Sequence, residues 1–181
     1  MRALLRFAVV GLALLALPAT ASAEKKAIWG PVTLPGGASA FPIYEELGVD
    51  VLQLQLYWDD VATERPNRGI DPADPAYRWP AELDEAVAMG SRHGIDVALM
   101  VKNTPGWANG GRTDNWAPND AQDYAEFVRA ASRRYASVDH WMIWGEPTRK
   151  ANFQPLPPDS RVGPRRYAKL LDAAYEQLKR E

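Results

Sequence analysis

Short apolar runs alternate with segments of helical period from residue 27 to the end of the 181-residue chain. Strands are expected at 27–29, 51–58, 97–101 and 140–144, and helices at about 41–47, 80–93, 119–135 and from 164 onward. Strict alternation of strands and helices favours a parallel sheet with right-handed crossovers. The sequence therefore predicts an α/β fold made of four successive βα units.

The second apolar run shows how the sheet is covered. Leu52, Leu54 and Leu56 share one face of this strand, whereas Gln53 and Gln55 share the other. Such alternation fits a sheet with helices on one side and a polar interior on the other. A (β/α)8 TIM barrel takes about 250 residues, so four units correspond to roughly half of one. We therefore expect the first four units of a TIM-type barrel, either truncated and inactive alone or completed by dimerisation.

The first 23 residues are typical of a secretory signal peptide. Arg2 and Arg6 precede an apolar stretch at 7–17, and Ala21-Ser22-Ala23 forms an A-x-A cleavage site. The apolar stretch is shorter than a spanning helix requires, although a membrane anchor or a buried helix remains the alternative. The sequence predicts a mature chain of residues 24–181 that is secreted, extracellular or periplasmic, with no membrane attachment after cleavage.

Composition excludes several classes of function. The formal net charge is −2, and no Lys/Arg cluster with interleaved aromatic residues points to nucleic acid. Cysteine is absent and only His93 and His140 are present, so no zinc site or Ser/Cys-His nucleophile is expected. Neither a G-x-G-x-x-G motif after a strand nor a P-loop occurs. We expect no metal and no cofactor, and both histidines to be structural.

The fourth apolar run, Trp141 to Trp144, delivers Glu146 to its carboxyl end, where Pro147 stops the strand. A carboxylate on the lip of a buried sheet is desolvated from one side, which suits it to proton donation. A solvated Glu that caps the next helix is the alternative. Glu146 is therefore the catalytic candidate.

Other polar and aromatic residues lie where a bound sugar would be reached. Asp59 follows the second strand and Lys102 and Asn103 end the third, although Asp and Asn also favour ordinary turns. Tryptophans stack on pyranose rings or fill cores. The substrate-binding candidates are Trp29, Trp58, Asp59, Lys102, Asn103, Trp107 and Trp144, with Trp116 a further stacking candidate. Asn152 and Phe153 are expected near the mouth of the site, and Glu64 and Asp114 are expected to be solvated.

Four motifs in order resemble those of clan A glycoside hydrolases, the cellulase-like and xylosidase-like retaining (β/α)8-barrel enzymes. Ile143-Trp144-Gly145-Glu146-Pro147 resembles their W-N-E-P signature. The other three are the segments 77–84, 103–108 and 118–135. The resemblance covers nearly all of residues 27–181 and implies a carbohydrate substrate and Glu146 as acid/base. It places the nucleophile after a seventh strand, beyond Glu181.

One position departs from the signature, because Gly145 stands where the family has an Asn that binds the sugar 2-hydroxyl. This departure keeps two alternatives open. One is a carbohydrate-binding barrel without catalysis, and the other is a half-barrel that folds as a homodimer. The sequence leaves the glycan, its linkage, endo or exo action and the oligomeric state open.

Overall fold

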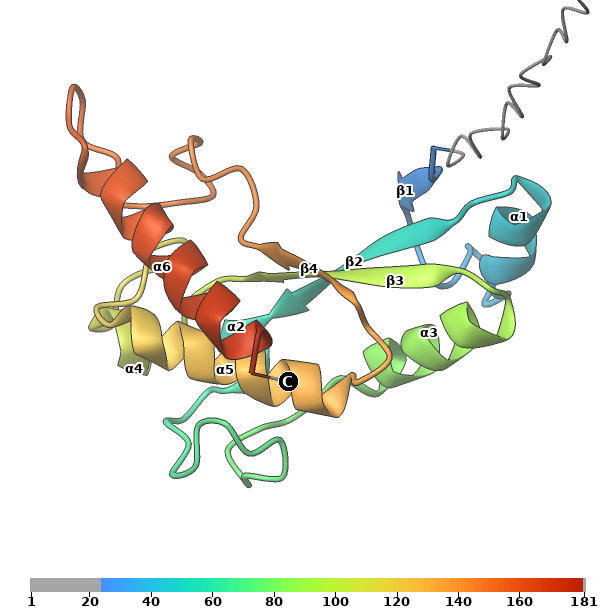
Figure 1. Ribbon diagram of the computed structural model, residues 1–181, viewed down its shortest axis with the longest axis horizontal. Helices are drawn as coiled ribbons and strands as arrows, with labels where there is room; N and C mark the ends of the chain where they lie inside the picture. Colours follow the sequence, from blue (N-terminus) through green and yellow to red (C-terminus); the bar gives the residue numbers. More distant parts are fainter. Residues whose placement is uncertain (1–23, 181) are drawn as a thin grey trace, which may run out of the picture.

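A computed structural model describes residues 24–180 and shows one parallel sheet (Figure 1). Its strands lie in the order β1 (Ala27–Trp29), β2 (Val51–Tyr57), β3 (Asp96–Lys102) and β4 (His140–Ile143). Every neighbouring pair is parallel, which confirms the four predicted βα units. The predicted signal peptide at 1–23 lies outside the described residues. No helix within residues 24–180 combines the length and apolar character that crossing a bilayer requires.

A longer helix follows each strand: α1 (Phe41–Glu46), α3 (Ala81–Arg92), α5 (Ala121–Arg134) and α6 (Val162–Leu178). The third of these begins at a capping residue, because the Asp120 side chain accepts a hydrogen bond from the Gln122 amide at 2.9 Å. Two single-turn helices were not predicted, α2 (Trp58–Val61) and α4 (Gly106–Asn109). Both lie at the carboxyl ends of strands, where a four-residue segment carries no readable period.

The two faces of the sheet differ as the leucine alternation predicted. Leu52, Leu54 and Leu56 are buried, and α3 and α5 lie on one side of the sheet (Figure 1). Residues of the opposite parity form the other face, which we call the open face: Trp29, Gln53, Gln55, Tyr57, Met100 and Met142. Trp29 is 70% exposed there. The open face corresponds to the interior of a barrel.

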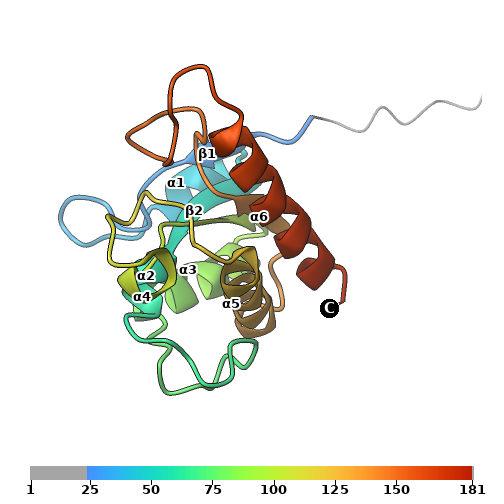
Figure 2. The same cartoon turned by 90° about the vertical axis from the view of Figure 1, so that its left-hand side faces the viewer.

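The carboxyl ends of β3 and β4 are fixed by side chains from the helix layer. The Tyr124 hydroxyl of α5 donates to the Val101 carbonyl at 2.7 Å, and the Tyr167 hydroxyl of α6 donates to the Ile143 carbonyl at 3.1 Å. Figure 2 shows α5 and α6 side by side. A buried hydrogen bond that loses one partner costs about 1–3 kcal/mol, so these contacts hold the strand ends in place.

Both histidines lie far from the carboxyl ends of the strands. His93 follows α3, and its Nδ1 lies 2.6 Å from a Glu45 carboxylate oxygen. His140 begins β4, and its Nε2 lies 3.7 Å from Asp96 at the start of β3. Each therefore pairs with a carboxylate at the amino edge of the sheet.

Candidate active site

Glu146 stands on a tight turn at the end of β4. Trp144 has a φ of 64° and Glu146 a φ of 44°, values that non-glycine residues rarely adopt. Surrounding contacts hold this turn, because the Trp144 indole donates to the Asn152 carbonyl at 2.7 Å and its amide donates to the Val101 carbonyl at 2.9 Å. Strained backbone that is held in this way is frequent at functional sites.

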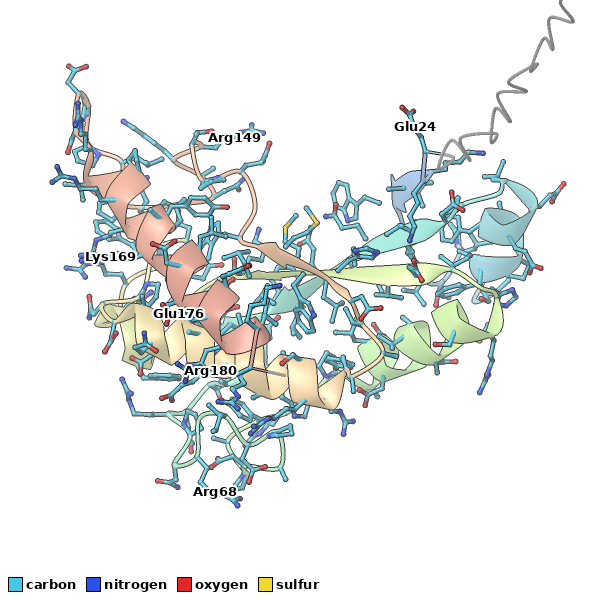
Figure 3. The ribbon with its side chains drawn as sticks, viewed as in Figure 1. Glu24, Arg68, Arg149, Lys169, Glu176 and Arg180 are labelled. Carbon is cyan, nitrogen blue, oxygen red and sulfur yellow. The ribbon has the colours of Figure 1, made fainter. Side chains whose placement is uncertain are left out.

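The Glu146 carboxylate has two side-chain partners on its own loop. Arg149 Nη1 lies 3.0 Å from Oε1 and 3.2 Å from Oε2, and Asn152 Nδ2 donates to Oε2 at 2.5 Å. Figure 3 shows Arg149 on the loop that follows β4, above the sheet. The Glu146 side chain is 55% exposed. The expectation that the Glu146 carboxylate is desolvated is therefore wrong, because this carboxylate faces solvent and the Arg149 guanidinium.

The loop that carries Glu146 is tied to the loop after β3. Asn115 Nδ2 donates to the carbonyls of Lys150 and Ala151 at 3.2 Å each, and the Gln154 amide donates to the Asn115 carbonyl at 2.8 Å. Sequence reasoning anticipated Asn152 near the mouth but missed Arg149 and Asn115. Loop residues carry no periodic signal, so no feature of a single sequence could have selected them.

A second polar group gathers at the ends of β2 and β3. Asn103, at a φ of 64°, donates its side-chain amide to Asp114 Oδ2 at 2.8 Å. Burial raises the pKa of Asp59, the charges of Asp60 and Asp114 raise it further, and a hydrogen bond from Asn103 lowers it. The structure thus brings the candidates Asp59 and Asn103 together in one polar group, to which Asp114 also belongs. Within residues 24–180, no group of three or more His, Asp or Glu side chains is arranged to hold a metal ion.

The raised pKa of Asp59 predicts a pH-dependent cost to stability. The folded protein retains a proton that the unfolded chain releases above the ordinary value of 3.8, so stability falls as pH rises from 3.8 through the raised folded pKa. We expect the melting temperature of wild type to fall relative to that of Asp59→Asn across this window, as measured by calorimetry between about pH 3 and pH 7. Asp172→Asn on exposed α6 is the control, and a pH-independent difference between Asp59→Asn and wild type would contradict the prediction.

Two of the five candidate tryptophans, Trp58 and Trp144, pack inside the protein. Trp58 is fully buried, stacked on Phe127 with ring centroids 5.7 Å apart and edge-to-face with Trp107 at 5.4 Å. Trp144 is only 3% exposed. Neither ring offers a face to a sugar, so both predictions are corrected to core residues.

The remaining candidates are at least partly accessible. The Trp107 indole donates to the Ala62 carbonyl at 2.7 Å, and the Arg65 guanidinium lies 4.4 Å from its ring centroid. Lys102 Nζ lies 5.8 Å from the Tyr57 ring centroid at the carboxyl edge of the open face. Trp29 is the most exposed aromatic candidate, which leaves it available for stacking.

The space beside Gly145 is occupied by a flexible side chain from the adjacent strand. A Cβ at this position would lie 2.7 Å from Met100 Sδ, closer than side chains approach. Met100 pairs in register with Met142 on β4 and with Gln55 on β2, so it belongs to the open face. The Met100 side chain thus occupies the space that an Asn at position 145 would enter.

We expect Gly145→Asn to destabilise the protein by about 1–3 kcal/mol, the usual cost of overpacking, and Met100→Ala to remove most of that cost. Urea unfolding of the two single variants and the double variant measures the coupling between the positions. Gly48→Asn controls for introducing the side chain, because a Cβ there would meet only Lys26 Nζ at an ordinary 3.7 Å and Asn tolerates the φ of 64° better than most residues. Additive effects of the two substitutions would show that Met100 does not exclude the larger residue.

The fold is the α/β class of the TIM-barrel type, represented by four βα units. A family 39 glycoside hydrolase from Bacteroides cellulosilyticus WH2 is similar, with a TM-score of 0.61 and 15% identity over 86% of this chain and 29% of that one. A glucosidase from Croceicoccus marinus has a TM-score of 0.60 and 15% identity over 86% and 33% of the two chains. The chain therefore spans about a third of the length of these proteins. No protein-family model and no curated protein matches it.

Proposed function

We propose that the protein is an exported glycoside hydrolase of clan A type that cleaves O-glycosyl bonds with retention, and that Glu146 is its acid/base. One observation carries the proposal: Glu146 stands on a held turn at the carboxyl end of the fourth strand in a fold shared with two glycosidases. Active sites of TIM-type barrels form at the carboxyl ends of the strands. Both the position of Glu146 in the fold and its carboxyl group therefore fit the role of acid/base.

In the first step, Glu146 protonates the leaving glycosidic oxygen while a second carboxylate, about 5 Å away, attacks the anomeric carbon. In the second step, the Glu146 carboxylate takes a proton from a water whose oxygen attacks the anomeric carbon, and the bond from this carbon to the second carboxylate breaks, which releases the sugar. Arg149 Nη1 lies 3.0 Å from Glu146 Oε1 and holds the carboxylate on its loop. The Arg149 side chain is 65% exposed, so this contact can open when a substrate enters. The resemblance assigns the nucleophile to a strand outside the four described here.

The proposal includes export through residues 1–23, supported by the basic start, apolar stretch and A-x-A site. Sequencing the amino terminus of the secreted product tests this part. Cleavage before Glu24 is the expected result, and a retained Met1 would contradict it.

Two observations favour a second candidate, a carbohydrate-binding protein without catalysis. Gly145 lacks the side chain that contacts the sugar 2-hydroxyl in the related enzymes, and Trp29 presents an exposed ring on the open face. The exposed Trp29 and Met142 also fit the third alternative, a homodimer that covers this face, which sedimentation of the mature chain would reveal.

Proton NMR of the first product that a protein with both Glu146 and the nucleophile releases from aryl glucosides and xylosides separates these functions. A retaining hydrolase gives a first sugar with the anomeric configuration of the substrate. An inverted product would contradict the proposed mechanism. Binding on a glycan array without any hydrolysis would favour the binding protein.

A further inference from the structure

Cations gather on the loop after β4 and the first half of α6. Residues 147–170 contain six basic side chains and one carboxylate, Asp159, in a chain whose net charge is −2. The six are Arg149, Lys150, Arg161, Arg165, Arg166 and Lys169. All but Arg166 are exposed. This segment is therefore a local positive region on a protein that is otherwise negative.

Most of this charge has no ionic partner within the described residues. Arg149 pairs with Glu146, and Arg166 Nη1 donates to the Pro118 carbonyl at 3.1 Å. The structure gives no ion pair to Lys150, Arg161, Arg165, Arg166 or Lys169 among residues 24–180. Unpaired like charges on one face repel each other, so an anion that binds among them gains their combined attraction.

Three of these cations line a surface groove between α6 and the segment before α5. We call it the basic groove: Pro118, Asn119, Arg165, Arg166 and Lys169. Ala117 and Leu170 form an apolar part of the same lining. The groove thus combines cationic side chains with an amide and an apolar floor, a combination that suits a charged sugar better than a small inorganic ion.

The basic groove lies on the βα unit that carries Glu146. Its α6 residues follow directly on the loop of Glu146, Arg149 and Lys150, and the segment before α5 bonds to this loop where the Ala117 amide donates to the Gln154 carbonyl at 2.8 Å. In Figure 3, Lys169 lies on the half of α6 nearer this loop, whereas Glu176 and Arg180 follow toward the other end. The cations are therefore concentrated toward the catalytic edge of the sheet.

We propose that the basic groove binds carboxylate or sulfate groups of an acidic polysaccharide whose chain extends from the site at Glu146. This inference rests on the proposed function and assigns its substrate class. Arginine forms paired hydrogen bonds with such anions, and Lys169 adds a point charge. Nucleic acid fits less well, because none of the residues that line the groove is aromatic and none can stack on a base.

The test compares two charge reversals on the same helix. Arg165→Glu/Lys169→Glu removes two cations from the groove, whereas Lys179→Glu/Arg180→Glu makes the same change in net charge at the far end of α6. Binding of the full mature chain to polygalacturonate and to dextran sulfate is measured by calorimetry at several salt concentrations. We expect the groove variant to bind at least one of the two polymers at least tenfold more weakly, with a shallower salt dependence. The far-end variant should bind within twofold of wild type.

Several comparisons sharpen the outcome. Fully methyl-esterified polygalacturonate keeps the sugar chain without its charge and should bind poorly, and polyglutamate and single-stranded DNA supply the charge without the acidic polysaccharide. Equal loss in both variants, or binding of polyglutamate or DNA as tight as that of the acidic polysaccharides, would overturn the proposal. Arg165→Gln/Lys169→Gln replaces the reversal if circular dichroism shows that the latter unfolds.

The experiment also distinguishes the basic groove from the proposed hydrolase function. Polygalacturonate and dextran sulfate show whether carboxylate or sulfate is preferred. Neutral aryl glycosides do not need the groove, so in a protein that also carries the nucleophile both double variants should hydrolyse them within twofold of wild type. In that protein, groove-dependent binding without hydrolysis of any substrate would support the basic groove and reject Glu146 as acid/base.

Discussion

In a protein that also carries the nucleophile, Glu146→Gln is expected to lower kcat/KM on an alkyl or unactivated aryl glycoside by about 10²–10⁴-fold, the usual contribution of general acid–base catalysis. Glutamine keeps the shape of the side chain but cannot give the leaving oxygen a proton. A dinitrophenyl glycoside needs no such help, so its glycosylation step should be nearly unchanged in a pre-steady-state burst. Azide, which needs no general base, should then restore turnover of this substrate.

Glu176→Gln, on the exposed side of α6, is the matched control and should leave every rate within twofold of wild type. The pattern across leaving groups distinguishes chemistry from damage to the fold. An equal loss on activated and unactivated substrates would point to a structural role for Glu146. Undiminished activity on unactivated glycosides would remove it from the mechanism altogether.

The sheet was predictable because its signals are local. Alternation along β2 put Leu52, Leu54 and Leu56 on the helix side, and the Asp120 cap marked the start of α5. Both features depend on a few neighbouring residues and on fixed backbone geometry. The order of an apolar strand and a helical segment recurs four times, and this order specifies a parallel sheet before any tertiary contact is known.

The tryptophans show where such reasoning fails, and for two different reasons. Trp58 continues the alternation of Leu52, Leu54 and Leu56, so the pattern itself places it on the helix side, and only its position at a strand end favoured a role in sugar binding. Trp144 has the parity of the open face, but its φ of 64° redirects the side chain toward Phe153 in the core, with ring centroids 5.3 Å apart. The first burial was readable from the pattern, whereas the second depends on a turn that the pattern does not encode.

The surroundings of Glu146 were unpredictable for a related reason. Its position at the strand end follows from the sequence, but its exposure depends on how the loop 147–161 folds. Arg149 and Asn152 reach the carboxylate from within that loop, and Asn115 holds the loop from a separate βα unit. Contacts of this kind follow from tertiary packing. The sequence therefore indicated Glu146 as the acid but not the side chains that surround it.

Trp58→Ala is expected to lower the free energy of unfolding by about 3–5 kcal/mol, the cost of removing a large buried ring. The Trp58 ring packs against Phe127, Trp107 and Tyr124, and its loss leaves a cavity between the sheet and α5. Urea unfolding followed by circular dichroism measures the change. If the variant is too unstable to purify, Trp58→Phe gives a smaller loss of the same sign.

Trp29→Ala is the matched control, because it removes the same side chain from a site that is 70% exposed. Its stability should change by less than about 0.5 kcal/mol, as is usual for surface substitutions. A ring that stacks on sugar instead contributes to binding, so Trp29→Ala should weaken glycan affinity while Trp58→Phe leaves it within twofold. Stability losses of similar size at both positions would show that the open face is covered in solution, since only a covered Trp29 would stabilise the fold as Trp58 does.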